Sequence, residues 1–358
     1  MLYRENGQFK TSYADDQGIF PIKQDAWFVV GLLAFAALIV PTLANEYFFQ
    51  AILIPFLILS LAAIGVNILV GYCGQISLGS AAFMAVGAYG AYNFFVRLDG
   101  IPLVLALLLG GASAAVAGIV FGIPSLRVRG LYLAVATLAA QFLSDWIFLR
   151  VGWFTLNTPS GTAAVKDLSV FGWALNSAAD KYWFCLIVLS VFALMAKNVT
   201  RGHTGREWMA VRDMDVAASV IGIRLMPAKL SAFAVSSFII GVAGALWAFV
   251  YLGAWEPSAF SLDLSFKLLF MVIIGGMGTI MGSMFGAAFI VVLPIFLNQF
   301  LPWLGGLLGL SITTATVTHV EFMTFGALIV WFLIVEPHGL AKLWSIAKQK
   351  LRIWPFPH

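Results

Sequence analysis

Residues 48–70 read FFQAILIPFLILSLAAIGVNILV, a run of 23 residues without Asp, Glu, Lys or Arg. An α-helix needs about 20 predominantly apolar residues to cross the hydrocarbon core of a bilayer. A helix on the surface of a soluble protein would instead carry a polar face. The stretch therefore predicts a transmembrane helix.

The composition of the whole chain points the same way. Of its 358 residues, 61% are hydrophobic and 10% are charged, whereas soluble domains carry about 25% charged residues. So few charges could not cover the surface of a soluble particle, which argues against a cytosolic enzyme, a disordered chain and a nucleic-acid-binding protein. The formal net charge of +4 fits a membrane protein, since such proteins concentrate Lys and Arg on the cytoplasmic side.

The chain offers ten candidate spans. They cover residues 26–44, 48–70, 76–96, 103–123, 131–149, 182–197, 231–252, 264–281, 284–301 and 319–336. The sequence therefore predicts an all-α polytopic membrane protein with about ten transmembrane helices. The third, eighth and ninth spans are rich in glycine, which makes them candidates for broken or re-entrant helices.

An even number of spans places both termini on one side of the membrane, and fifteen of the 20 Lys and Arg residues then fall on that side. The positive-inside rule assigns that side to the cytoplasm. The expected organisation is a cytoplasmic N-terminal tail (1–25), a transmembrane domain (26–336) and a cytoplasmic C-terminal tail (337–358). Within the domain, residues 198–230 form a cytoplasmic loop and residues 151–181 a periplasmic one.

Glycine-rich stretches allow two interpretations. Small residues at every fourth position, as at Gly278, Gly282 and Gly286, let helix backbones pack closely. Irregular backbone at membrane depth can also line a wet path for a solute. The candidates for such a path are Gly71, Gly74, Gln75, Ser77, Gly79, Thr137, Gly275, Gly276 and Gly278. The side chains of Gln75, Ser77 and Thr137 bond either to protein or to water and solute.

Signals for catalysis and metal binding are weak. The four histidines do not form a pair at metal-ligand spacing, and the chain contains no Gly-Lys dipeptide, hence no phosphate-binding P-loop. Asp145, Lys267 and Glu321 lie near predicted span ends, where they can reach the interface. We therefore expect no enzyme activity, no metal and no cofactor in this chain, and any ATP and Mg²⁺ to be bound by a partner.

The loop 198–230 predicts a short amphipathic helix. Thr204 and Glu207 are spaced as a capping box, with Thr204 as the N-cap. Gly222 can end the helix. Its apolar side comprises Trp208, Val211, Met214, Ala218 and Ile221. Such a helix either lies on lipid or docks a cytoplasmic protein, and its mixed charge favours docking.

Several motifs resemble a known family. Residues 216–222, VAASVIG, are similar to the EAA loop of permeases of ATP-binding-cassette (ABC) importers, with Val216 in place of the usual Glu and Asp215 one position earlier. Residues 71–79, GYCGQISLG, resemble the opening signature of the branched-chain amino acid permease family. Similar motifs follow at residues 126–138, 205–212, 229–245, 275–287 and 336–340. The resemblance covers roughly residues 50–340 and is strongest to the longer, LivM-type permease subunit.

The sequence departs from this family's pattern at two places. Members often follow the Thr-Leu motif, here Thr137-Leu138, with Gly-Glu, and later carry Thr-Gly-Gly. Here Gln141-Phe142 and residues 158–161, TPSG, stand instead. The departures concern the choice of solute rather than the architecture.

The resemblance implies a permease subunit of an importer in the bacterial inner membrane. Its expected partners are a second, related permease, two cytoplasmic ATPases, a periplasmic solute-binding protein and membrane lipid. The residues expected in the ATPase-coupling helix are Thr204, Gly205, Arg206, Arg212, Asp215, Ala217, Ala218 and Gly222. The expected solute is of the branched-chain amino acid type, with urea, short amides or small carboxylates as alternatives.

Two other classes of function remain as alternatives. An ion-coupled secondary transporter would usually need ionisable groups or a formed ion site at the membrane midplane. A membrane enzyme or scaffold would gather polar residues at one membrane face. The sequence offers neither pattern clearly, and the importer is the favoured interpretation.

Overall fold

The computed structural model describes residues 12, 23–98, 100–125, 131–156, 158, 160–165, 168–170, 172–308, 314–335 and 339–353. Several predictions fall wholly or partly outside these residues: most of the N-terminal tail, residues 126–130 and 336–338 of two family motifs, and residues 354–358 of the C-terminal tail.

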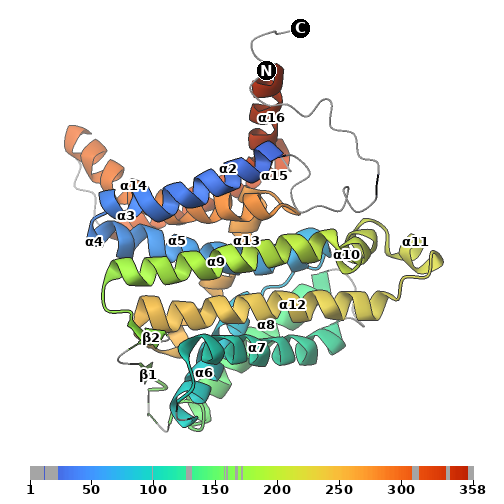
Figure 1. Cartoon of the computed structure of the whole chain (residues 1–358), viewed down its shortest axis with the longest axis horizontal. Coiled ribbons are helices and arrows are strands. Elements are labelled where there is room, and N and C mark those ends of the chain that lie inside the picture. The colour runs from blue at the N-terminus through green and yellow to red at the C-terminus, as the bar shows by residue number, and fades with distance from the viewer. Residues whose placement is uncertain are drawn as a thin grey trace.

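The described chain is almost entirely helical (Figure 1). Its α-helices are α2 (Lys23–Ala34), α3 (Val40–Leu43), α4 (Glu46–Phe48), α5 (Ile54–Asn67), α6 (Ser80–Arg97), α7 (Leu103–Ser125), α8 (Leu131–Arg150), α9 (Ala178–Arg201), α10 (His203–Asp213), α11 (Asp215–Val220), α12 (Leu225–Leu246), α13 (Leu262–Gly275), α14 (Ile280–Leu308), α15 (Thr314–Val335) and α16 (Gly339–Ile353). Four π-helical turns, η1 (Phe35–Ile39), η2 (Phe49–Leu53), η3 (Ile68–Tyr72) and η4 (Trp247–Leu252), and one 3-10 turn, η5 (Pro257–Phe260), join or extend them.

Eight of the described helical segments are long and apolar enough to cross a membrane. Together with α6 and α15 they correspond to the ten predicted spans, and the prediction of an all-α polytopic membrane protein is confirmed. Several predicted boundaries were wrong by four residues or more; the seventh span, for example, begins at Leu225 rather than 231. The eighth span ends at Gly275 rather than 281, and the ninth begins at Ile280 rather than 284, because the glycines between them break the helix.

Two of the π-helical turns lie just before a proline. Pro41 follows η1 and Pro55 follows η2. A proline ring collides with the carbonyl of the residue four positions earlier, and its nitrogen has no hydrogen to donate. A wider turn just before the proline lets the helix continue past it.

The centre of the bundle is formed by α12, which packs against α5, α6 and α7. Glycines allow these backbones to touch. A Cβ atom added to Gly87 would lie 2.1 Å from the carbonyl oxygen of Gly241, and one added to Gly244 would lie 2.1 Å from that of Met84. The predicted Gly282 and Gly286 likewise pack directly on the backbone of α13, so the small-residue spacing marks helix packing there.

The two ends of the bundle differ. In Figure 1 the long helices run horizontally, with α10 and α11 at the right end. At the other end, β1 (Ala163–Ala164) pairs antiparallel with β4 (Ala254–Trp255), and β2 (Ser169–Val170) with β3 (Trp173–Ala174). These four short strands are the β-structure found among the described residues, whose fold is otherwise helical.

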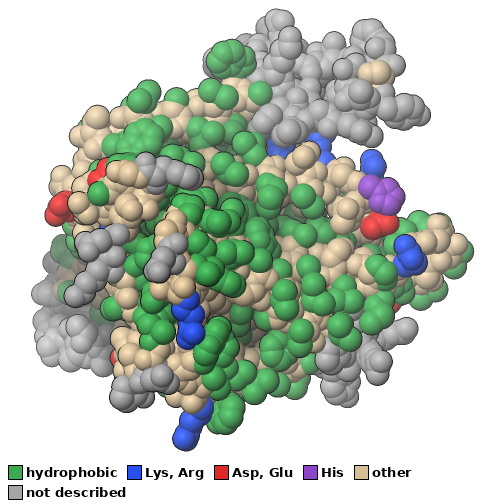
Figure 2. All heavy atoms as spheres, turned by 60° about the horizontal axis from the view of Figure 1, so that its bottom comes forward, with side chains coloured by type: hydrophobic (Ala, Val, Ile, Leu, Met, Phe, Trp, Pro, Cys, Tyr) green, Lys and Arg blue, Asp and Glu red, His purple; other side chains and the backbone are tan. Residues whose placement is uncertain are grey.

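The surface between the two ends is apolar. Figure 2 shows hydrophobic side chains spread over the visible face, which few charged groups interrupt. Large side chains are exposed there, among them those of Val135, Phe142 and Trp146 on α8. Exposed apolar area of this extent needs lipid or another protein to cover it. The protein is a multi-pass membrane protein.

Candidate functional site

A first helix break follows α5. The helix widens into η3 and then unwinds over residues 73–79 before α6 begins at Ser80. The backbone N–H of Gln75 donates to the carbonyl of Leu69 at 3.0 Å, and that of Gly74 to Val70 at 3.2 Å. Gly74 has φ of +71°, a conformation that side-chain-bearing residues rarely adopt. The prediction of irregular backbone within residues 71–79 is confirmed.

A second break separates α13 from α14 over residues 276–279. Gly276 and Gly278 have φ of +119° and +76°, which explains why glycine stands at both positions. Gly275 lies against the carbonyl of Gly282 on the next helix, so it packs α13 on α14. The predicted glycines of this stretch therefore form a turn and a tight helix contact.

Asn67, the last residue of α5, ties this helix to the second break. Its Nδ2 donates to the carbonyl of Thr279 at 2.7 Å and to Oγ of Ser283 at 2.8 Å, and its Oδ1 accepts the backbone N–H of Gly278 at 2.8 Å. The side chain is 1% exposed. Buried backbone groups at membrane depth must find a partner inside the protein, and this one amide supplies partners on both sides of the turn.

Arg212 on α10 reaches the same place. Its Nη1 donates to the carbonyl of Gly71 at 2.7 Å, while Nη2 pairs with Asp213 at 2.8 Å. A Cβ added to Gly74 would meet the Arg212 side chain at 2.8 Å, and one added to Gly278 would meet it at 3.3 Å. The structure thus brings a predicted coupling residue into contact with three predicted path residues.

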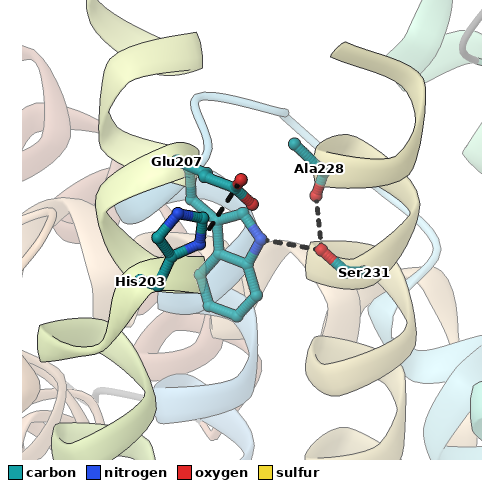
Figure 3. A network of polar contacts seen from close by, with 5 residues as sticks. His203, Glu207, Ala228 and Ser231 are labelled. Atoms are coloured by element: carbon teal, nitrogen blue, oxygen red, sulfur yellow. Dashed lines mark hydrogen bonds and ion pairs between the residues drawn. The ribbon is translucent and has the colours of Figure 1, made fainter. Parts of the chain in front are cut away.

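The predicted capping box was wrong. Helix α10 begins at His203 with Gly202 as its N-cap and no side-chain cap, so Thr204 lies inside the helix. Glu207 pairs with His203 at 3.5 Å instead (Figure 3). The chain turns so tightly after α9 that a Cβ on Gly205 would meet the carbonyl of Thr200 at 2.1 Å, and this close return decides where the helix starts.

Trp208 anchors α10 to the bundle. Its side chain is fully buried, and its Nε1 donates to Oγ of Ser231 on α12 at 2.9 Å. Ser231 in turn donates to the carbonyl of Ala228 at 2.8 Å. Figure 3 shows Ser231 and Ala228 on α12, at the end of this chain of bonds. Helix α10 is therefore packed firmly against α12 rather than lying free on lipid.

The single helix expected over the loop is two helices. Met214, at φ −160° and ψ 99°, separates α10 from α11. Gly222 ends α11 as predicted, with φ of +92°. The N–H of Ile223 donates to Ala218 at 3.0 Å and that of Gly222 to Ser219 at 3.1 Å, which is the Schellman arrangement.

Helix α11 exposes apolar side chains at the end of the bundle. Met214, Val216, Val220 and Ile221 are exposed, Val220 to 81%, whereas Ala218 is buried beneath them. The remaining predicted coupling residues Arg206 and Ala217 are exposed, and Asp215 is partly so. We call the four exposed apolar residues the α11 patch.

A second polar cluster lies at the start of α6. The fully buried Gln141 donates from Nε2 to the carbonyl of Phe260 at 2.8 Å and accepts from Oγ of Ser265 at 3.3 Å. Ser265 also accepts the N–H of Ala81 at 2.8 Å. These contacts join α6, α8 and α13 through uncharged groups.

Two of the predicted path residues are bonded to the protein. Thr137 accepts the N–H of Leu78 at 2.9 Å and donates to the carbonyl of Ala134 at 3.0 Å. Ser77 accepts the N–H of Gly79 at 3.3 Å. Gly79 packs on the Thr137 carbonyl, where a Cβ would come within 2.5 Å. These three residues hold the first break against α8.

Gln75 differs from them. Its side chain is 5% exposed, and neither its Nε2 nor its Oε1 has a hydrogen-bond partner among the described residues. Such a group costs about 1–3 kcal/mol when it stays unsatisfied. An unpaired buried amide beside a helix break is therefore the best candidate for contact with a solute or water.

The charged residues expected near span ends find partners. Lys267 on α13 lies 3.8 Å from Glu321 on α15, and Asp145 accepts from Nε2 of Gln141 at 3.3 Å. Among the described residues, His, Cys, Asp and Glu do not gather in groups of three or more that could hold a metal ion.

Sequence reasoning missed Asn67, Ser265 and Ser283. Asn67 could have been noticed, because a lone Asn within an apolar span usually bonds across helices. The partners of Asn67 could not have been predicted, since they lie more than 200 residues away along the chain. Gln141 was noticed only as a departure from the family's pattern.

Comparison with known proteins identifies the family. Residues 48–333 match the family described as branched-chain amino acid transport system / permease component. The chain belongs to this family.

The relatives of this permease include two proteins named LivM. The high-affinity branched-chain amino acid transport system permease protein LivM of Escherichia coli is 29% identical over 305 residues, which cover 78% of this chain and 67% of the relative. The probable LivM of Methanocaldococcus jannaschii is 24% identical over 243 residues, 66% and 68% of the two chains. The fructose import permease protein FrcC of Rhizobium meliloti is 26% identical over 283 residues, 75% and 76%. No solved structure matches the permease.

We predict that Asn67→Leu destabilises the permease without preventing its insertion into the membrane. The substitution leaves the partly buried N–H of Gly278 and the carbonyl of Thr279 without this partner, at a cost of up to about 1–3 kcal/mol for each group. Thermal unfolding in detergent can be followed with a thiol-reactive dye, because Cys73 and Cys185 are both free and buried.

The matched control is Asn298→Leu, whose amide makes an exposed bond to the carbonyl of Pro294. It should unfold at the wild-type temperature. An Asn67→Leu protein as stable as this control would show that the two breaks hold without the amide.

Proposed function

We propose that this chain is the permease subunit of an ABC importer that moves a small amino acid-like solute, of the branched-chain type, across a bacterial inner membrane. The observation that carries the proposal is the bond from Arg212 to the carbonyl of Gly71, which ties an end-facing helix to a helix break inside the bundle. Family membership and the LivM relatives support the choice of solute.

In this proposal the chain performs no chemistry. Two cytoplasmic ATPases bind and hydrolyse ATP with Mg²⁺, a second related permease completes the path, and a periplasmic binding protein delivers the solute. The permease must then offer two arrangements of its helices, and ATP on the partners must favour one of them.

The geometry supplies a route for that coupling. An ATPase seated on the α11 patch would displace α10 and α12 together, because Trp208 fixes α10 to α12. Arg212 would transmit the displacement to Gly71, and Asn67 would carry it to the second break. Backbone turns at glycine can change conformation at low cost, so both breaks are suited to two arrangements.

Apart from Asp145, which accepts a bond from Gln141, the lining proposed for the path is polar but uncharged. Gln75 provides an unpaired amide, and Gln141 and Ser265 lie in the polar cluster at the start of α6. Such a path suits a zwitterionic or neutral solute better than a strongly charged one. Leucine, isoleucine and valine are the first solutes to test, with urea, short amides and small carboxylates as competitors.

The proposal places the end with α10 and α11 in the cytoplasm, together with both termini. Cysteines introduced at the exposed Ser219 and Gln349 should be labelled by an impermeant maleimide only from the cytoplasmic side, and one at the exposed Ser169 only from the periplasmic side. Labelling of positions 219 and 349 from opposite sides would mean an odd number of spans and would refute this topology.

We predict that Val220→Asp releases the ATPases. A central apolar contact contributes about 2 kcal/mol or more to an interface, so retention of the ATPases in a pull-down should fall by about tenfold or more. Val220 is exposed and lies outside the core, so the permease itself should fold normally. Val220→Leu keeps the patch apolar and should retain the ATPases; equal retention by both variants would place docking elsewhere.

We predict that Gln75→Leu abolishes most uptake while leaving the fold intact. Removing an unsatisfied buried amide should leave thermal stability unchanged or higher, but it removes the group proposed to contact the solute. Uptake into proteoliposomes that contain the whole transporter should fall by about tenfold or more. Gln50→Leu, at an exposed glutamine of η2, is the control; normal uptake by Gln75→Leu would remove Gln75 from the path.

A further inference from the structure

The loop between α8 and α9 is bonded to α6 at the end of the bundle that carries the short strands. We call its residues 153–156 and 160–165, which include β1, the α8–α9 segment. In Figure 1, β1 lies at the same end of the bundle as α6. The side chains of Tyr89, Asn93 and Arg97 on α6 all bond to this segment. They are four residues apart, so they lie on one face of the helix.

Asn93 is the centre of these contacts. Its Nδ2 donates to the carbonyls of Phe154 at 2.9 Å and of Tyr89 at 2.8 Å, and its side chain is 5% exposed. Its Oδ1 accepts from Nε of Arg97 at 3.0 Å. Arg97 in turn donates from Nη2 to the carbonyl of Trp153 at 2.7 Å, and its Cζ lies 4.3 Å from the centre of that indole, a cation–π contact. Two side chains of α6 therefore hold two consecutive carbonyls of the α8–α9 segment.

The second half of the segment is held on both sides. The hydroxyl of Tyr89 donates to the carbonyl of Gly161 at 2.9 Å. On the other side, Ala163 of β1 lies opposite Trp255 of β4, and the N–H of Val165 donates to the carbonyl of Gly253 at 3.1 Å. The α8–α9 segment thus joins α6 to the chain between α12 and α13.

Both supports of the segment lead to the polar cluster at the start of α6. After β4 the chain forms η5, which ends at Phe260, and the carbonyl of Phe260 accepts from Gln141. Helix α6 begins at the same cluster, where the N–H of Ala81 donates to Oγ of Ser265. The contacts that hold the segment are therefore made by elements that also hold the groups proposed to line the solute path.

The bonded arrangement carries two local costs. The indole of Trp255 is 2% exposed and packs against the rings of Tyr89, Tyr92 and Phe249. Its Nε1 has no hydrogen-bond partner among the described residues, which is unfavourable for a buried donor. Leu156 has φ of +52°, a conformation rare for a residue with a side chain, and such strain persists only where surrounding contacts impose it. Movement of the segment away from α6 would relieve both costs, because water could then reach the indole.

We propose that the α8–α9 segment closes the periplasmic entrance of the solute path, and that Tyr89, Asn93 and Arg97 are positioning residues that hold it closed. This inference rests on the proposed function, which places the strand end of the bundle in the periplasm. A transporter with two arrangements must close its entrance in one of them. Because α6 carries all three side chains, a displacement of α6 at the polar cluster breaks their bonds together and opens the entrance.

The first test measures opening of the segment in the purified full-length chain and does not require transport. Thr155 is 1% exposed, and Thr155→Cys places a thiol of similar size beneath the segment. Its reaction with a maleimide in detergent is followed by mass spectrometry of the peptides. Arg97→Gln should speed labelling at position 155 about fivefold, the effect of losing one ordinary hydrogen bond. The buried Cys73, at the first helix break, should stay protected.

The matched control is Arg150→Gln, at an exposed arginine that ends α8 near the same loop. It should leave the labelling rate at position 155 unchanged. Equal rates for Arg97→Gln and Arg150→Gln would overturn the proposal. Faster labelling of Cys73 together with position 155 would also overturn it, because that result indicates a general loss of stability rather than opening of one segment.

The second test fixes the segment in place with a disulfide. Ala164 and Ala254 are exposed and lie opposite each other in the β1–β4 pair, and opposite residues of antiparallel strands are close enough for a disulfide. Oxidation of the Ala164→Cys, Ala254→Cys protein should stop leucine uptake into proteoliposomes that contain the whole transporter, and a reductant should restore it. The matched control joins Ser169→Cys to Ala174→Cys across the β2–β3 pair and should transport equally when oxidised and when reduced.

The results separate the entrance from the proposed function. Normal uptake by the oxidised β1–β4 protein would overturn the proposed entrance, and so would equal loss of uptake by the oxidised β2–β3 control. Absence of leucine, isoleucine and valine uptake by the reduced proteins and the wild-type transporter would instead refute the proposed solute. In that case the labelling rates at position 155 still decide whether the α6 side chains hold the segment closed.

Discussion

The amide of Asn67 is the interaction on which the rest of the candidate site depends. Two helices break within the bundle, and each break exposes backbone groups where lipid offers no hydrogen bonds. Asn67 bonds to Gly278, Thr279 and Ser283 at once. Because its donor and acceptor are both used across the gap, the position of one break fixes the position of the other. The same contact leaves no room for a side chain at Gly71, whose Cβ would lie 1.9 Å from Oδ1 of Asn67.

Close packing connects the helix breaks to the surface helices α10 and α11. Helix α10 cannot slide freely, since Trp208 is fully buried and bonded to α12. Arg212 extends from this anchored helix to the carbonyl of Gly71. Close-packed interiors transmit displacement rather than absorb it. The α11 patch, the anchored α10 and the two glycine breaks therefore form a continuous series of contacts from the surface to the interior, which is what an importer driven by partner ATPases requires.

The bundle also separates two kinds of interior environment. Helix α5 contributes Asn67 to the hydrogen-bonded breaks, while its Phe56 and Leu57 line an apolar cavity beside α2. Polar groups gather where backbone must be satisfied, and apolar side chains line most of the cavity. The two environments meet at Tyr72, next to the first break, and at Thr279 of the second, because both residues also line the cavity.

The sequence by itself determined the class of the molecule, because spans such as residues 48–70 contain no charged side chain and few polar ones. It also determined where the backbone becomes irregular, because only glycine adopts positive φ readily. Gly74, Gly222 and Gly278 all have positive φ, and this preference is a local property of each residue. Tertiary structure alone decided which breaks meet. The bond between Arg212 and Gly71 joins residues 141 positions apart. Tertiary structure also decided where α10 lies, because the fully buried Trp208 bonds to Ser231 on α12, 23 residues away along the chain.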